Sequence, residues 1–248
     1  MKKWKIPLLV LITLVLLLVC ASLPEIAAVI QDGVGMDTFG FSHMQTIKLD
    51  FSGEQRPESI LGKLALIRDG NFYTISPRET TISHNDIENV VKEGLNPYYE
   101  GELVPYNWKN CEFSAVPHFV SDPADVKNHA ILWIVSLYWP DSGEKLQLYV
   151  DDETGLILYF HYGTKNALDV YSAQGYLETF SGIYFESTGM SEILTHPEDY
   201  GVESVTYSDA GMYTNDDKSF SCTLHHPDYG SITMEFWLYT NGYYTLIR

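Results

Sequence analysis

Cations and cysteines are scarce in this sequence. Its 248 residues include 15 Lys and Arg against 33 Asp and Glu, for a net charge of −18. So negative a surface repels phosphate groups, which excludes nucleic acid as a partner. Of the three cysteines, Cys20 lies in an apolar run, which leaves Cys111 and Cys222 as the pair for a disulfide in an oxidising compartment. Two isolated thiols form no disulfide framework, so we expect them to stay unpaired.

The sequence also lacks the short motifs of several common catalytic sites. It holds no Gly-x-Ser-x-Gly elbow, no His-Glu-x-x-His pair, no phosphate-binding loop ending in Gly-Lys-Ser/Thr and no Gly-x-Gly-x-x-Gly. The sequence therefore predicts no catalytic residue, no cofactor-binding residue and no metal ligand. Active sites also assemble from residues far apart in the chain, so an enzyme stays an alternative.

A few polar clusters nevertheless invite a closer look. The strongest metal-ligand pattern is His225-His226-x-Asp228, but adjacent strand residues point to opposite faces, and we interpret it as the polar rim of a hairpin. The run Asp151-Asp152-Glu153 lacks the alternating spacing of a calcium loop and predicts a solvated turn. His118 has no identifiable partner. Glu178 and Glu186 are interpreted as exposed carboxylates rather than an acid–base pair.

Residues 1–24 carry the clearest functional signal. Lysines at positions 2, 3 and 5 precede an uncharged, mostly apolar run from Ile6 to Pro24. The length of this run approaches the roughly 20 residues needed to span a bilayer, and the lysines favour the cytoplasmic side. We expect residues 1–24 to be a single-pass membrane anchor, with the C-terminal domain outside the cytoplasm. Without the three lysines, that domain holds 12 basic against 33 acidic residues, a net charge of −21.

Two alternatives to the anchor remain open. Val19-Cys20-Ala21 offers small residues to a signal peptidase, and cleavage there would make the protein secreted. Leu17 to Cys20 resembles a lipobox, except that Val19 stands where that motif has Gly, Ala or Ser.

The strong acidity of the exported part is explained by solubility; attraction of cationic partners or calcium is the alternative explanation.

Beyond a predicted stalk or linker over 25–56, hydrophobic patterning predicts an α+β protein with two helix-plus-antiparallel-sheet units, 57–165 and 166–248. In the first unit, helical spacing runs from residue 60 to 69, and a second helix near 84–95 begins at Ser83 or Asn85. The segment 96–129 predicts loops with short strands. Three strands, 129–139, 145–150 and 156–162, then form an antiparallel meander.

The second unit follows a similar plan. Residues 167–185 predict a helix, and the strands 202–207, 220–224, 232–239 and 243–247 follow, the last pair joined by an Asn241-Gly242 turn. The turn sequence Pro140-Asp141-Ser142-Gly143 recurs at a constant offset as Pro227-Asp228-Tyr229-Gly230. This suggests an internal repeat, although hairpin turns draw on few residue types in any case.

Aromatic residues are abundant, with 18 Tyr, 11 Phe and 5 Trp. Tyr and Trp suit half-buried sheet faces, where the ring packs and the polar tip reaches water. Such rings also line carbohydrate and peptide grooves. No clustering is visible along the chain, so we interpret the aromatic residues as sheet formers.

One hairpin resembles a known family. Tyr149-Val150-Asp151, followed after two residues by Thr154-Gly155, is similar to the hairpin of PepSY-type domains, small exported modules in which a helix packs on a sheet. The resemblance covers only part of the first predicted unit, and the insertion 96–129 departs from the family's compact pattern. It implies a non-catalytic accessory role at the cell envelope, such as modulating a protease or sensing a ligand. The whole chain also resembles uncharacterised membrane-anchored proteins of Gram-positive bacteria.

Together these patterns predict a membrane-anchored, extracytoplasmic binding or regulatory protein of the bacterial cell envelope. Its expected partners are the membrane, through the N-terminal helix, and an envelope protein or peptide. The alternatives are an envelope hydrolase acting on peptide or glycan, and a structural subunit of an envelope complex.

Overall fold

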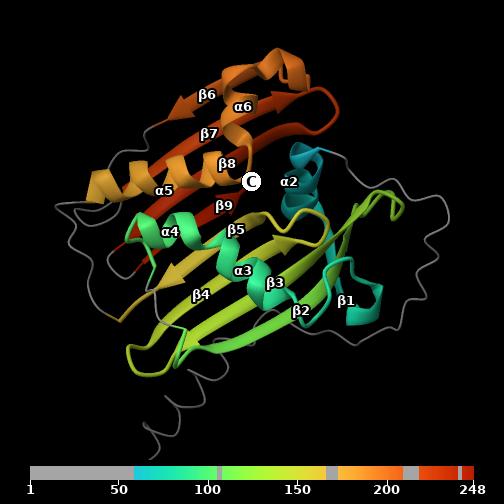
Figure 1. Ribbon diagram of the computed structural model, residues 1–248. Helices are drawn as coiled ribbons and strands as arrows, with labels where there is room; N and C mark the ends of the chain where they lie inside the picture. The colour runs from blue at the N-terminus through green and yellow to red at the C-terminus, as the bar shows by residue number, and fades with distance from the viewer. Residues whose placement is uncertain (1–58, 105–107, 166–172, 209–217, 240–241) are drawn as a thin grey trace, which may run out of the picture. The chain divides into compact units, whose positions relative to one another are not determined.

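A computed structural model describes residues 59–104, 108–165, 173–208, 218–239 and 242–248 (Figure 1). The predicted anchor or signal segment, 1–24, and the predicted linker, 25–56, lie outside these residues. Within the described part of the chain, no helix combines the length and the apolar character needed to cross a membrane.

Nine strands form one antiparallel sheet (Figure 1). Across the sheet the strands are β1 (Asn71–Thr74), β2 (Glu112–Ser121), β3 (His129–Trp139), β4 (Glu144–Asp151), β5 (Ile157–Gly163), β9 (Gly242–Ile247), β8 (Gly230–Tyr239), β7 (Lys218–His226) and β6 (Ser204–Ser208). The predicted fold class, with two helix-plus-antiparallel-sheet units, is therefore wrong. The strands expected in two sheets continue across β5 and β9 into one.

The pairing of β5 with β9 joins the two halves of the sheet. His161 pairs with Tyr244, Tyr162 with Tyr243, and Gly163 with Gly242. The backbones come so close here that a Cβ atom on Gly242 would lie 2.0 Å from the carbonyl oxygen of Tyr162. Glycine at this position is therefore a packing requirement of the junction. We call this junction the seam.

Five helices accompany the sheet in the described residues: α2 (Ile60–Asp69), α3 (Ile87–Gly94), α4 (Asn96–Glu100), α5 (Ala173–Ser187) and α6 (Met190–Thr195), with short 3-10 turns at Pro77–Glu79 and Pro197–Tyr200. Figure 1 shows α3, α4, α5 and α6 in front of the sheet. The predicted helices at 60–69 and 84–95 are confirmed as α2 and α3. The helix predicted from 167 is confirmed over α5; residues 167–172 lie outside the described residues.

The hydrophobic core lies between these helices and the sheet. Alternating residues of the strands point toward the helices, and Leu148 and Phe236 are fully buried there. The Phe180 ring of α5 lies 5.1 Å from Phe160 of β5, centroid to centroid. The Tyr184 hydroxyl donates to the Leu158 carbonyl at 2.8 Å, which fixes α5 across β5. The helix-facing side of the sheet is therefore a packed aromatic core.

The meander predicted over 129–162 is confirmed as β3, β4 and β5, and the strands predicted in the second half are confirmed as β6 to β9. The glycines matched by the suggested repeat, Gly143 and Gly230, have φ of 70° and 69°. Both turns thus need a residue that tolerates a left-handed backbone. The Asn241 part of the predicted Asn241-Gly242 turn lies outside the described residues.

One long strand, β2, falls where loops with short strands were predicted. Pro117 lies in its middle and reads as a strand breaker in a sequence. The Pro117 carbonyl accepts from the Ile75 amide at 3.0 Å, on the β1 side, so the missing N–H also faces that side and costs the β2–β3 ladder nothing. Proline is tolerated here because β1 is short and ends beside it.

Candidate functional site

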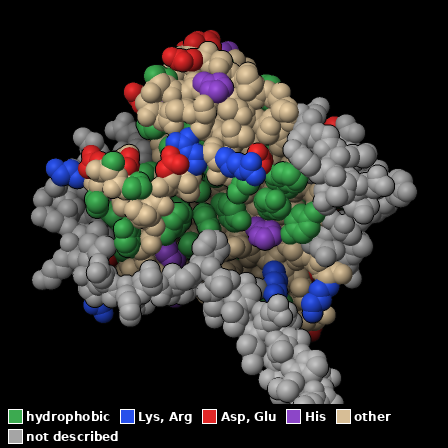
Figure 2. Space-filling model, turned by 180° about the vertical axis from the view of Figure 1, so that it is seen from behind, with side chains coloured by type: hydrophobic (Ala, Val, Ile, Leu, Met, Phe, Trp, Pro, Cys, Tyr) green, Lys and Arg blue, Asp and Glu red, His purple; other side chains and the backbone are tan. Residues whose placement is uncertain are grey.

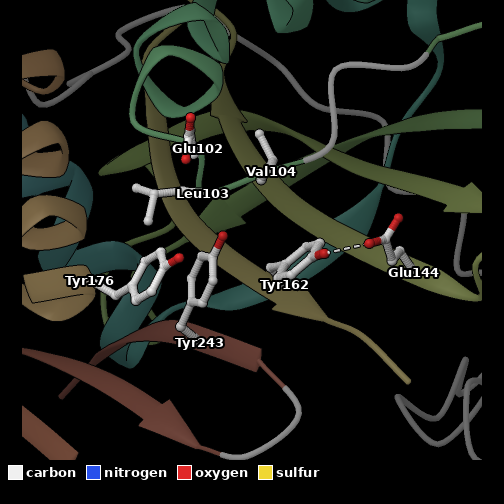
Figure 3. Close-up of a pocket in the computed structure, with 7 residues that line it drawn as sticks. All are labelled: Glu102, Leu103, Val104, Glu144, Tyr162, Tyr176 and Tyr243. Atoms are coloured by element: carbon white, nitrogen blue, oxygen red, sulfur yellow. Dashed lines mark hydrogen bonds between the residues drawn. The ribbon is translucent and has the colours of Figure 1, made fainter. Parts of the chain in front are cut away.

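A cavity of about 250 Å³ lies on the helix-covered side of the seam (Figure 3). Three parts of the fold meet there: the loop after α4, the first turn of α5, and the strands β4, β5 and β9. Its lining residues are Glu102, Leu103, Val104, Glu144, Tyr162, Tyr176 and Tyr243. We call it the seam cavity.

The seam itself sets two of the cavity's aromatic walls. Tyr162 and Tyr243 are direct partners in the β5–β9 ladder, and their ring centroids lie 5.1 Å apart. The Tyr243 ring centroid also lies 5.1 Å from that of Phe180, so this wall of the cavity packs directly against the aromatic core. Tyr176 of α5 forms the more open wall, with 37% of its surface exposed. The cavity thus has two rigid aromatic walls and one at its mouth.

The loop after α4 holds a glutamate in a backbone conformation that glycine prefers. Glu102 has φ of 57°, the one positive value among the described non-glycine residues. The amide of Glu102 donates to the Tyr99 carbonyl at 3.0 Å, and that of Leu103 donates to the Tyr98 carbonyl at 2.9 Å. This is the hydrogen-bond pattern of a Schellman helix end, where the left-handed position is usually Gly. A carboxylate is therefore held at the cavity at a local cost of about 1 kcal/mol.

The second carboxylate, Glu144, is half-buried at the start of β4. Its Oε1 accepts from the Tyr162 hydroxyl at 2.9 Å, and its Oε2 accepts from the Ser142 hydroxyl at 2.6 Å. Both donors are neutral. Across the described residues, neither Glu102 nor Glu144 forms an ion pair with a Lys, Arg or His. Each carboxylate at the cavity is therefore outside any ion pair that the described residues form.

The Tyr243 hydroxyl is the most unusual group in the cavity. Only 3% of the residue is exposed, yet this hydroxyl forms no hydrogen bond with any described group. Figure 3 shows the ring between Tyr176 and Tyr162, with its hydroxyl directed into the cavity. Burial, with the nearby Tyr162, Tyr176 and Glu144, raises the pKa of Tyr243 well above its usual value, so the hydroxyl stays protonated. Buried polar groups nearly always have a hydrogen-bond partner, so a buried hydroxyl without one is unusual.

The cavity lining combines phenols, carboxylates and apolar side chains. None of the seven described lining residues is a Ser, Cys, His or Lys, so Glu102 and Glu144 are the lining groups of a kind that serves as nucleophile or general acid and base. Burial and the neighbouring Glu144 also raise the pKa of Tyr162 far above its usual range. Hydrogen-bonding phenols, aromatic faces and carboxylates remain as the recognition groups.

A second aromatic surface occupies the opposite face of the sheet. The rings of Tyr149 and Tyr159 stack at 4.4 Å, and His161 hydrogen-bonds to the Tyr239 hydroxyl at 3.0 Å. Figure 2 shows hydrophobic side chains gathered around histidines on this face. The strand register brings these rings together from β4, β5 and β8. They do not cluster along the chain, so the sequence did not reveal this surface.

The acidic run Asp151-Asp152-Glu153 is structural, and the predicted solvated turn is wrong. Asp152 is fully buried and accepts from the amides of Thr81 and Ile82, at 2.6 and 3.0 Å, and from the Trp133 indole at 2.8 Å. The Trp133 bond crosses from the turn to β3. This carboxylate therefore holds the segment before α3 against the sheet.

Asp151 and Glu153 both bind the buried ammonium group of Lys63. The Lys63 Nζ lies 2.8 Å from Asp151 and 2.7 Å from Glu153. Asp151 also accepts from the Thr154 amide at 3.0 Å, and Gly155 has φ of 74°. The residues shared with PepSY-type hairpins thus build this turn and hold α2 against it.

The other sequence candidates do not converge on a site. His225 hydrogen-bonds to the Ser231 hydroxyl at 2.8 Å, while His226 accepts from the Asp228 amide at 3.1 Å and stacks on Tyr229. Among the described residues, no three His, Cys, Asp or Glu side chains are placed to hold a metal ion.

His118, for which the sequence offered no partner, lies between the Thr74 hydroxyl and the Val116 carbonyl at 3.2 and 3.1 Å. Glu178 and Glu186 are exposed on α5, as expected. Cys111 and Cys222 are free thiols.

Ser142 and Lys145 form a Ser-x-x-Lys pattern, a spacing that occurs at the active site of some hydrolases. The Ser142 hydroxyl donates to Glu144, while the Lys145 ammonium lies over the Tyr138 ring, 5.8 Å from its centroid. The two side chains have different partners and form no nucleophile–base pair.

Sequence reasoning missed every residue of the seam cavity. Tyr162 and Tyr243 were assigned to strands, and Glu102 to a loop, without a functional role. The cavity depends on a strand pairing between residues far apart in the chain, which leaves no local pattern.

No family model, no curated protein and no solved structure matches the chain. The resemblance of its hairpin to PepSY-type domains therefore stays a prediction.

Proposed function

We propose that this protein is a membrane-anchored, extracytoplasmic binding protein of the bacterial cell envelope, and that the seam cavity is its ligand site. It binds a small ligand, or a side chain of an envelope protein or peptide, without transforming it. The PepSY-like hairpin implies the same kind of accessory role.

One observation carries the proposal: the Tyr243 hydroxyl is buried, has no partner among the described residues, and faces the cavity. Leaving a buried hydroxyl unpaired costs roughly 1–3 kcal/mol. A ligand that supplies the missing hydrogen bond recovers this free energy on binding, which gives the site a reason to be occupied.

The walls of the cavity add support. Its two carboxylates come from separate parts of the chain, and one of them, Glu102, requires an unfavourable backbone conformation. Backbone strain of this kind concentrates at ligand and active sites. Two carboxylates are also the groups that glycoside hydrolases use, so an envelope hydrolase acting on glycan remains the alternative function.

The location is argued from the segment 1–24 alone. Three lysines followed by the apolar run Ile6 to Pro24 favour export with the lysines left inside. A fusion of residues 1–30 to a reporter in bacterial cells tests this. We expect the reporter outside the cytoplasmic membrane, and a cytoplasmic reporter would contradict the proposed location.

The binding role is tested on the full-length protein in mild detergent. Saturation-transfer NMR against an extract of envelope small molecules and peptides compares the wild type with Tyr176→Ala, which removes the open wall. A matched control, Tyr207→Ala, removes an exposed tyrosine of β6, 56% exposed and outside the cavity. We expect ligand signals for the wild type and the control but not for Tyr176→Ala. Equal signals from all three would refute the seam cavity as the ligand site.

A further inference from the structure

We infer that the seam cavity recognises a primary alkylammonium group. The inference rests on the proposed function and specifies its ligand. The group can belong to a small free amine or to the lysine side chain of a partner, because both present the same ammonium on an alkyl stem.

The charge of the cavity selects a cation. Glu102 and Glu144 contribute two carboxylates, and neither forms an ion pair with a described Lys, Arg or His. Lys165 lies beside Gly143, next to Glu144, but it does not line the cavity and makes no ion pair with that carboxylate. The acidic excess of the whole chain, 33 acidic against 15 basic residues, attracts the same class of ligand over longer distances.

The aromatic walls favour an organic cation over a metal ion. Three tyrosine rings line the cavity, and an ammonium near such a ring is attracted to its negative face. Leu103 and Val104 add apolar surface that an alkyl stem can contact. Calcium instead takes about six to eight oxygen ligands, and this mixed wall does not offer such a shell.

The unpaired hydroxyl distinguishes a primary ammonium from a quaternary one. A primary ammonium carries three N–H donors, one of which can donate to the Tyr243 oxygen, while Glu102 and Glu144 add negative charge from separate sides of the cavity. A quaternary ammonium has no N–H and leaves the Tyr243 hydroxyl unpaired. The volume, about 250 Å³, is below the roughly 300–1,000 Å³ of drug-sized sites, so it fits one short chain.

Isothermal titration of the full-length protein in detergent, at constant ionic strength, tests the inference. The probes are n-butylammonium, its neutral counterpart n-butanol, tetramethylammonium, and a short peptide with a single lysine. We expect saturable binding of n-butylammonium at least about tenfold tighter than that of n-butanol or tetramethylammonium. Tighter binding of the peptide identifies a protein partner as the source, and tighter binding of butylammonium identifies a free amine.

Two matched pairs of variants locate the binding. Tyr243→Phe removes only the hydroxyl and should weaken butylammonium binding about tenfold or more. Glu144→Gln removes the charge and also replaces one of the oxygens that accept from Tyr162 and Ser142 by a donor, and it should weaken binding severalfold. The controls Tyr207→Phe and Glu186→Gln make the same changes outside the cavity and should leave the affinity unchanged. Equal loss in variants and controls, or equal affinity for the neutral probe, overturns the inference. If butylammonium fails but envelope-extract signals still depend on Tyr176, the ligand class is wrong while the proposed function stands.

Discussion

Replacing Asp152 by alanine tests how a buried carboxylate holds this fold together. Its two oxygens accept from two backbone amides and from the Trp133 indole, and no part of the residue is exposed. A hydrogen bond to a charged group contributes about 1.5–3 kcal/mol, and removing the acceptor leaves three buried donors unpaired. After a discount for the lost desolvation cost of the carboxylate and for non-additivity, we expect Asp152→Ala to lower the free energy of unfolding by about 3–5 kcal/mol.

The assay is guanidinium chloride unfolding of the full-length protein in detergent, followed by the near-UV circular dichroism of its tryptophans. Domains of this size are typically stable by about 5–15 kcal/mol, so the transition midpoint should fall steeply. Asp228→Ala, an exposed carboxylate in the β7–β8 turn, is the matched control and should change stability by less than about 0.5 kcal/mol. Equal destabilisation by the two variants would refute the structural role of Asp152.

Three further predictions concern other sites. Burial lowers the pKa of Lys63, but hydrogen bonds and charges from Asp151 and Glu153 outweigh it, so the pKa in the folded protein is raised. These ion pairs therefore stabilise the fold fully below the unfolded pKa of about 10.4. The thermal unfolding midpoint should fall as the pH rises through the higher pKa of the folded protein. Glu102→Gly should raise the free energy of unfolding by about 1 kcal/mol while weakening butylammonium binding, and no gain in chemical denaturation would count against the strained helix end. Burial raises the pKa of the Cys222 thiol to about 12, so iodoacetamide at pH 8 should modify this thiol only after the protein unfolds. Mass spectrometry measures the modification, and rapid modification of the folded protein would contradict the burial of Cys222.

The local parts of the fold could be predicted from the sequence. The meander from β3 to β5 was predictable because alternating residues and turn glycines such as Gly143 act over a few positions. The helix α3 was predictable from the spacing of Ile87, Val91 and Leu95, all fully buried.

The global arrangement could not be predicted in the same way. The seam joins strands that are far apart in the chain, and the pairing of β5 with β9 decides whether there is one sheet or two. The strand β2 was hidden by Pro117, whose missing N–H matters only if a neighbouring strand needs it. Both outcomes depend on which strands lie side by side, and hydrophobic periodicity carries no information about that.

The candidate site was invisible for a related reason. Tyr162 and Tyr243 look like ordinary strand residues until their pairing turns two rings and one unpaired hydroxyl toward a shared cavity. The acidic turn shows the opposite error, because Asp152 looks solvated in the sequence and is buried by contacts with Thr81 and Ile82, which lie far from it in the chain.

The affinity of n-butylammonium for the full-length wild type and for Tyr243→Phe, measured side by side by calorimetry, tests the central claim most directly. The Tyr243 hydroxyl has no partner in the described structure, so its removal should leave folding intact and the unfolding midpoint unchanged or slightly higher. We expect saturable binding by the wild type and binding about tenfold or more weaker by the variant. Equal affinities for the two proteins, or no binding by a folded wild type, would contradict it.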